Sequence, residues 1–274
     1  MALQLSLIDN KVARRITLSF ILAALIPIVI FGLLSFRQVS EQLRDQSAQA
    51  LRKSTKDYAM VLIERLSLAK NALRLVAIIL DKSGTKFNFN ELGRDQNLAN
   101  QFFSLVLINP KGEKTQLINK TDSIAELSKD DVVEIKANKT LIKPVINTDS
   151  STSTLWMAMN LVENHPEAGI IMAELPKGQV WESENTQPND LWVLGKTNQL
   201  LFTSAQDYDL PAEAKQQILS SNSGHFSWNN KDIPYVGSYW KIPMKGMFSA
   251  PDLTIVLVQP ESMAFEAIQQ FAET

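Results

Sequence analysis

An uninterrupted apolar run near the start of the chain is the strongest pattern in the sequence. Residues 16–36, ITLSFILAALIPIVIFGLLSF, form a 21-residue stretch without a charged side chain. A helix of about 20 apolar residues crosses the bilayer core. A cleaved signal peptide would have a shorter core of about 7 to 15 residues and a small-residue cleavage site, whereas Arg37 and Gln38 follow here. We therefore predict that residues 16–36 form an uncleaved transmembrane helix.

The basic residues around this run bear on its orientation. Three lie on each side: Lys11, Arg14 and Arg15 before it, and Arg37, Arg44 and Arg52 after it. Basic residues favour the cytoplasmic side of the membrane. Because the two sides carry equal numbers, the count alone does not orient the helix. The Arg14-Arg15 pair next to the run and the long remainder of the chain favour a cytoplasmic N-terminus, residues 1–15. Residues 37–274 are then expected in the periplasm, anchored in a bacterial inner membrane by a single span.

The apolar positions after this run recur at helical spacing. From Arg37 to Leu80 the chain contains neither Gly nor Pro, which favours one long helix over residues 37–80. Its apolar stripe follows a heptad-like spacing: Tyr58, Leu62, Leu66, Ala69, Leu73, Val76 and Leu80. The stripe can pack on the chain's own globular part, and the half of the helix nearer the membrane can pair with a second copy. Both roles, packing and pairing, can hold along one helix, which is expected to serve in signalling and in homodimerisation.

Strand patterns begin within residues 81–176, which we predict to form a first domain. Two apolar runs over residues 102–119 flank a Pro-Lys-Gly turn, a pattern typical of a hairpin. Residues 122–138 have a helical pattern, whose buried positions would be Ile124, Leu127, Val132 and Ile135. Three strands are expected to follow, at residues 140–148, 154–162 and 168–176.

The same order of elements recurs over residues 190–260, the predicted second domain. It comprises a hairpin at 190–204 with a turn at Lys196, Thr197 and Asn198, a helix at 211–221, and strands at 225–230, 233–243 and 253–260. Each predicted domain ends in a strand, a proline and a helical pattern, at Pro176 and at Pro260. We expect residues 177–189 to be a linker helix and residues 261–274 an exit helix towards a second transmembrane segment.

Composition excludes several classes of function. The 27 basic and 29 acidic residues give a formal charge of −2, so the chain lacks the basic field with which proteins bind nucleic acid. It contains no cysteine, which rules out disulfides, thiolate zinc sites and cysteine nucleophiles. No nucleophile, base and orienting group occur together. This region is therefore not expected to be an enzyme, and no catalytic residue, metal site or cofactor is expected.

The order of elements resembles the double Cache (dCache) family of extracytoplasmic sensors. The resemblance covers almost the whole chain and includes the phrase SGHFSWNNKDIPYVGSYW at residues 223–240. It implies an α+β fold in which a transmembrane helix extends into a long helix, followed by two PAS-like antiparallel-sheet domains. In this family the first domain lies farther from the membrane and usually holds the ligand, while the second transmits the signal.

The resemblance implies a receptor for signal transduction. The segment RRITLSFILAALIPIVIFGLLSF is most similar to those preceding diguanylate cyclase (GGDEF) and phosphodiesterase (EAL) modules, and histidine kinases and chemoreceptors have comparable regions. We expect the native chain to continue past Thr274 into a second span and a cytoplasmic output domain. The alternative is a membrane-anchored periplasmic binding or assembly module without output. The expected partner is a small-molecule ligand or a periplasmic protein.

The candidate ligand-binding residues lie in the first domain. Alternation along residues 154–160 puts Trp156 and Asn160 on one face of a strand, where an aromatic ring and an amide suit a small polar ligand. Glu174 is a third candidate, and Lys143 is the nearest cation. The Tyr, Arg, Trp-Tyr and Asp arrangement of amino-acid-binding dCache members is absent, because residues 102–174 contain neither Arg nor Tyr. The Asp130-Asp131 pair is expected to be solvated.

Overall fold

The computed structural model divides the chain into two compact units, Met1–Gln49 and Ala50–Thr274, which are described separately. The residues that the structure describes are 11–83, 101–118, 124–146, 153–181, 189–205 and 208–263. Helix α1, Lys11–Ser83, contains residues of both units. The predicted helix over residues 37–80 is thereby confirmed.

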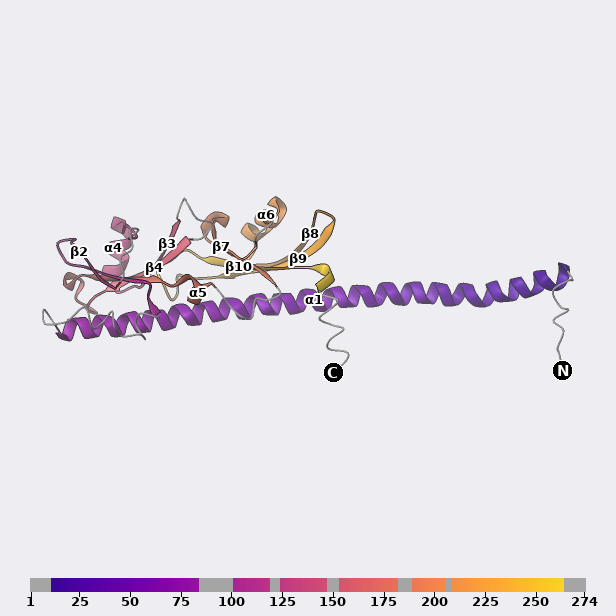
Figure 1. The fold of residues 1–274 in the computed structure, drawn as a ribbon, viewed down its shortest axis with the longest axis horizontal. Helices are drawn as coiled ribbons and strands as arrows, with labels where there is room; N and C mark the ends of the chain where they lie inside the picture. Colours follow the sequence, from indigo (N-terminus) through magenta and orange to yellow (C-terminus); the bar gives the residue numbers. More distant parts are fainter. Residues whose placement is uncertain are drawn as a thin grey trace. The chain divides into compact units, whose positions relative to one another are not determined.

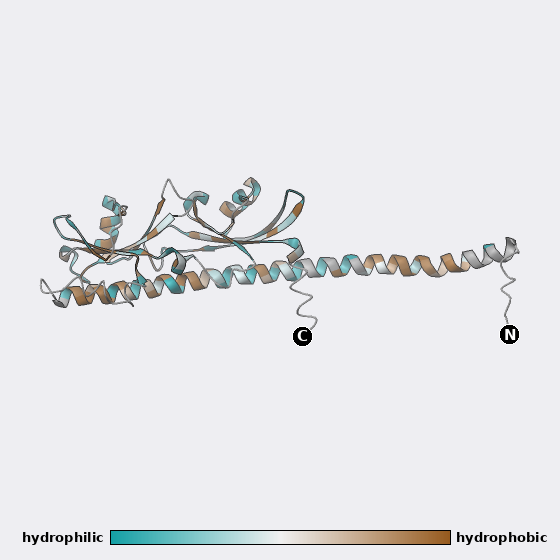
Figure 2. Cartoon of the chain, in the orientation of Figure 1, coloured by the Kyte–Doolittle hydropathy of each residue, from teal (hydrophilic) through white to brown (hydrophobic). Residues whose placement is uncertain are grey.

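The first unit contains an apolar segment of α1. Ser19–Val39 is long and apolar enough to cross a membrane, and none of this segment is buried. Figure 2 shows the corresponding hydrophobic stretch in brown towards the N-terminal end of α1. The segment begins three residues later than predicted. It contains Pro27 within the helix, which transmembrane helices tolerate because neighbouring groups can satisfy the freed carbonyl.

The second unit contains two antiparallel sheets, which confirms the predicted α+β fold. Sheet A consists of β1 Ser104–Ile108, β2 Lys114–Ile118, β3 Leu141–Ile146, β4 Ser153–Asn160 and β5 Ile170–Leu175. Its spatial order is β2-β1-β5-β4-β3. Sheet B consists of β6 Asp190–Leu194, β7 Leu200–Thr203, β8 Ser223–Asn230, β9 Ile233–Ile242 and β10 Leu253–Pro260. Its order, β7-β6-β10-β9-β8, repeats that of sheet A.

Short helices connect the strands: α4 Lys129–Lys136, η3 Pro166–Ala168, α5 Lys177–Val180, η5 Lys196–Asn198 and α6 Ala212–Ser220. Helix α4 is shorter than the predicted helix at 122–138. The Ser128 side chain accepts a hydrogen bond from the Asp131 amide while Asp131 accepts one from the Ser128 amide, and this capping box fixes the first turn. Most of the predicted linker and exit helices lies outside the described residues. The predicted domain boundaries stay predictions.

Helix α1 packs against one face of both sheets. The predicted stripe is buried at Tyr58, Leu62, Leu66, Leu73, Val76 and Leu80, within one core that also contains residues of both sheets. Packing on the chain's own globular part, one of the two roles open to this stripe, is therefore confirmed. Burial raises the pKa of Tyr58, so its phenol stays protonated and donates to the Trp181 carbonyl.

The two sheets contact successive parts of α1. Arg52 donates to the Ser223 hydroxyl at 3.5 Å in sheet B, and the Lys56 ammonium lies 5.4 Å from the Trp240 ring centroid. Arg74, farther along the helix, pairs with Glu163 in the connection between β4 and β5. Within the second unit, sheet B therefore packs on the part of α1 that is nearer in sequence to the apolar run, and sheet A packs on the part farther from it (Figure 1).

Candidate ligand-binding face of sheet A

Four polar residues form a single row across sheet A. Lys143 on β3 lies opposite Trp156 on β4, and Trp156 lies opposite Glu174 on β5. Glu174 in turn lies opposite Ser104 on β1. Directly opposed residues of antiparallel strands point to the same face, with neighbouring strands about 4.8 Å apart. The register therefore brings together three of the residues predicted from the sequence and adds Ser104.

This row lies on the face of sheet A that points away from α1. An apolar cluster of sheet residues, including Trp156 and Met172, packs there against Ile135 of α4 and Ala125. Ile124, Leu127 and Val132 are partly buried in the same cluster. Trp156 is 1% exposed, Ser104 0% and Glu174 6%. Helix α4 and the segment before it thus cover Trp156, Glu174 and Ser104 and remove them from water, whereas the Lys143 side chain stays 33% exposed.

Two buried donors in this row lack partners. The Trp156 Nε1–H and the Ser104 hydroxyl have no hydrogen-bond partner among the described residues. A buried polar group left unsatisfied costs about 1–3 kcal/mol, and buried polar atoms in native proteins are seldom left so. Both groups are donors, so this part of the row can accommodate an acceptor such as a carbonyl or carboxylate oxygen.

Lys143 links the sheet to its covering helix. Its Nζ donates to Asp131 Oδ2 and to the Glu126 carbonyl, each at 2.7 Å. Its charge is therefore already compensated by Asp131. The prediction that Lys143 serves a ligand as a cation stays untested, and its observed contacts are those of a tether between β3 and α4.

The Asp131 carboxylate is not the solvated group expected from the sequence. Burial would raise its pKa, but hydrogen bonds from Lys143 and from Ser128 outweigh burial, and the pKa lies below its usual value. The resulting stabilisation is fully present above the ordinary aspartate pKa of about 3.9 and is lost as the pH falls through the lower folded value. The tether between α4 and β3 is therefore intact at neutral pH.

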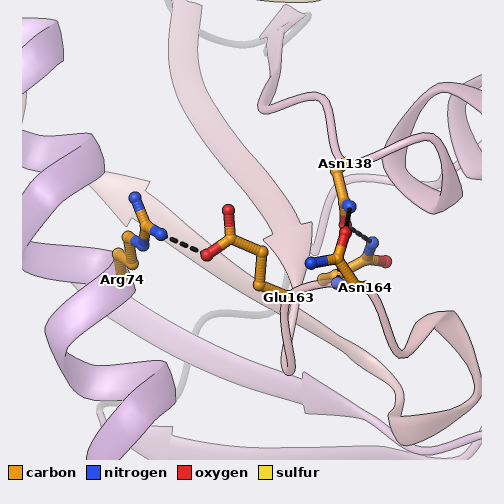
Figure 3. A network of polar contacts seen from close by, with 5 residues as sticks. Arg74, Asn138, Glu163 and Asn164 are labelled. Atoms are coloured by element: carbon orange, nitrogen blue, oxygen red, sulfur yellow. Dashed lines mark hydrogen bonds and ion pairs between the residues drawn. The ribbon is translucent and has the colours of Figure 1, made fainter.

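Asn160 lies on the same face but belongs to a separate network, of which Figure 3 labels Asn138 and Asn164. Its Nδ2 donates to Asn138 Oδ1 at 2.8 Å, and Asn138 Nδ2 donates to Asn164 Oδ1 at 2.6 Å. Asn138 and Asn164 have left-handed backbones, with φ of 61° and 63°. The network joins the end of α4 to the turn after β4, beside the Arg74 and Glu163 pair. Asn160 as a ligand residue stays a prediction.

Of the residues that were missed, only Ser104 has a signal in the sequence, and that signal is weak. Ser104 interrupts the apolar run FFSLVLI, and a serine within a buried strand is a candidate polar contact. Asn138 and Asn164 had no comparable signal, because only the folded chain brings them together. Within the described parts of the chain, no group of three or more His, Asp or Glu side chains is placed to hold a metal ion.

The chain's sequence has no detectable counterpart among known protein families or curated proteins. No family profile matches it, and no curated protein does so either.

Solved structures of chemoreceptors share the fold. The ligand-binding domain of Campylobacter jejuni chemoreceptor Tlp3 in complex with 4-methylisoleucine matches with a TM-score of 0.56 at 11% identity, over 81% of this chain and 94% of that chain. Its complex with L-valine gives 0.55 at 12%, over 82% and 96%. The ligand-binding domain of Pseudomonas fluorescens chemoreceptor CtaA in complex with L-isoleucine gives 0.54 at 13%, over 83% and 98%. The chain thus has the double-Cache-like fold of these domains.

Proposed function

We propose that residues 37–274 are the extracytoplasmic ligand-sensing region of a bacterial membrane receptor. The proposal is supported by the double-Cache-like fold and by the N-terminal helix segment Ser19–Val39. The observation that carries it is the pair of buried donors on sheet A, Trp156 Nε1 and Ser104 Oγ, which have no hydrogen-bond partner in the part of the chain that the structure describes. A binding site needs a few such polar groups on an otherwise apolar surface.

The row on sheet A favours a small amphoteric ligand. Trp156 and Ser104 offer hydrogen-bond donors to a carboxylate, and the Glu174 carboxylate between them can accept from an amine. The comparable domains of Tlp3 and CtaA were crystallised with amino acids such as L-valine and L-isoleucine. Residues 102–174 contain no Arg, so a ligand carboxylate would contact neutral donors here. We therefore propose an amino acid or a related small molecule, bound against Trp156, Glu174 and Ser104 under α4.

Replacing Ser104 with alanine distinguishes a ligand-binding role of this side chain from a role in stability. In the ligand-free full chain in detergent, Ser104→Ala should leave the free energy of unfolding unchanged or raise it, because the removed hydroxyl has no partner among the residues that the structure describes. Ser153→Ala is the matched control: the buried Ser153 hydroxyl donates to the Leu201 carbonyl at 2.6 Å, so its loss should cost about 1 kcal/mol.

Calorimetric titration of the full chain with the L-amino acids, and with the amines and keto acids derived from them, is the experiment that identifies the ligand. Ser104→Ala and Trp156→Phe should each weaken binding about tenfold, the effect of losing one hydrogen bond to a charged group. Ser153→Ala should leave the affinity unchanged. Equal affinities in all variants, or a destabilising Ser104→Ala, would contradict the proposed site.

We propose that the receptor signals through a cytoplasmic output domain, a diguanylate cyclase or phosphodiesterase module by preference, otherwise a histidine kinase or chemoreceptor domain. Residues 1–15 would be cytoplasmic and residues 37–274 periplasmic, with sheet B nearer the inner membrane. A ligand can shift such a receptor only through unequal affinity for its two arrangements, typically about 1–3 kcal/mol. A second apolar span encoded after Thr274 supports this proposal, and its absence favours an anchored binding module.

We further propose a homodimer along α1, through the half of residues 37–80 that is farther in sequence from the apolar run, and not the nearer half predicted from the sequence. Apolar side chains on this helix are exposed at Leu68 (61%), Leu75 (62%) and Ile79 (41%). Their spacings of seven and four residues are those of a coiled-coil seam. A second copy of the same helix would present the matching seam, as expected for a two-fold symmetric interface.

Lysine at both Leu68 and Leu75 should convert the full chain to a monomer in sedimentation equilibrium, because two charges would be buried at the seam. Met60→Lys is the control, since Met60 is also exposed (54%) but lies off this spacing. A wild-type chain that sediments as a monomer, or a double variant that stays dimeric, contradicts this interface.

A further inference from the structure

A cleft lies between the two sheets, and of the polar row only Lys143 lines it. It has a volume of about 830 Å³ and is lined by α4 and β3, by the turn after β6, by the end of α6 and the end of β9, and by Lys245 and residues 248–252. Sites for small molecules commonly enclose about 300–1,000 Å³. The cleft is therefore large enough for a small organic ligand.

The walls of the cleft are fixed to each other by Ser249. Its amide donates to the Thr140 carbonyl at 2.8 Å, and its carbonyl accepts from the Ile142 amide at 3.2 Å. Its hydroxyl donates to Glu134 Oε2 at 2.8 Å. These contacts join the loop before β10 to α4 and to the edge strand of sheet A, so they fix this loop against sheet A.

The lining of this cleft is basic although the chain as a whole carries a net charge of −2. Five lysines face three carboxylates, an excess of two positive charges. Lys143 pairs with Asp131 and Lys139 pairs with Glu134. The third carboxylate, Asp252, accepts a hydrogen bond from the Met244 amide at 3.2 Å.

The other three lysines of the lining are Lys196, Lys241 and Lys245. Across the described ranges, none of them takes part in an ion pair or a side-chain hydrogen bond. Like charges gathered in a concave surface raise the local concentration of counter-ions. The geometry therefore favours an anion with more than one charged group.

The backbones that carry two of these lysines are held in place. Lys196 opens a turn in which Thr197 and Asn198 have φ of 58° and 59°, and Asn198 Nδ2 donates to the Lys215 carbonyl. Lys245 lies in a turn closed by the Phe248 amide, which donates to the Met244 carbonyl at 2.9 Å. Met244 and Phe248 are 0% and 3% exposed. The charges are thus presented by anchored turns.

We propose that this cleft binds a small organic anion with two or more carboxylate or phosphate groups, held by Lys196, Lys241 and Lys245. Apolar side chains of Ile218, Leu219 and Phe248 in the lining suit the carbon skeleton of such a molecule. Because both sheets contribute to the cleft, the bound anion would bridge them. This site is independent of the ligand proposed on sheet A.

Calorimetric titration of the full chain in detergent with citrate, malate and inorganic phosphate tests the proposal. We expect saturable binding of at least citrate, which weakens when the salt concentration rises from about 0.05 to about 0.5 M. The cleft variant, Lys196→Gln with Lys241→Gln and Lys245→Gln, should bind at least about tenfold more weakly, because it loses charge-assisted hydrogen bonds.

Two control variants make the outcome decisive. Lys111→Gln with Lys114→Gln and Lys231→Gln removes the same charge from exposed positions outside the cleft and should bind as the wild type does. Ser104→Ala, in the sheet A row, should also bind normally. No saturable binding of any of the three anions, equal affinity in the two lysine variants, or loss of binding in Ser104→Ala would overturn the proposal.

Discussion

Alanine at Gly169 is expected to lower the free energy of unfolding by about 3 kcal/mol or more. Gly169 precedes β5 and has φ 114° and ψ −174°, a region of backbone space that is essentially confined to glycine. A Cβ there would lie 2.5 Å from the backbone carbonyl oxygen of Ile108. That oxygen belongs to the end of β1, which pairs with β5 at Ile108 and Ile170, so relief of the clash would disturb the centre of sheet A.

The matched control for this change is Gly112→Ala. Gly112 also has a positive φ, of 85°, but a Cβ there would meet nothing within 4 Å. It should therefore show only the cost of the left-handed backbone, about 1 kcal/mol. Urea unfolding of both variants, followed by tryptophan fluorescence, measures the difference. Equal losses in the two variants would mean that the contact with Ile108 is not limiting.

Leu62→Ala is expected to destabilise the chain by about 2–5 kcal/mol, the range for removing a fully buried leucine side chain. Leu62 is 1% exposed and belongs to the core shared by α1 and the two sheets. The loss combines the transfer free energy of the deleted methyl groups with the cavity that they leave, because packed strands on both sheets can collapse only partly around α1.

Met60 provides the comparison on the same helix. It lies two residues away and is 54% exposed, so Met60→Ala should change the free energy of unfolding by about 0.5 kcal/mol or less. Chemical unfolding of the two variants side by side removes the contribution of helix propensity, since alanine is introduced in both. A loss below about 1 kcal/mol in Leu62→Ala would show that this face of α1 is not packed as described.

Strand positions could be predicted from the sequence because their signals are local. The Lys196, Thr197 and Asn198 turn separates β6 from β7, as expected from turn-forming residues between apolar runs. The end of β10 at Pro260 follows from the missing amide of proline. The start of α4 was misplaced, although the Ser128 and Asp131 pair that caps it is visible in the sequence.

The partner of the α1 stripe could not be predicted, since a heptad-like spacing fits a sheet or a second helix equally well. Strand alternation placed Trp156 and Asn160 on one face, but the row that joins Trp156 to Glu174 and Ser104 depends on cross-strand register. Register is set by long-range pairing between β1, β4 and β5. That Trp156 Nε1 and Ser104 Oγ are buried without a hydrogen-bond partner among the described residues depends on the packed structure and could not be predicted from the sequence.

The core that α1 shares with both sheets also determines how the second unit can be divided. Leu105 and Leu155 of sheet A and Val193 and Ile255 of sheet B belong to the same apolar cluster as Leu62. Excising either sheet would expose the apolar face that it presents to α1, and a single small sheet buries too little surface to compensate. Although the two sheets repeat one topology, we expect them to unfold together with this helix, because all three contribute to one apolar cluster.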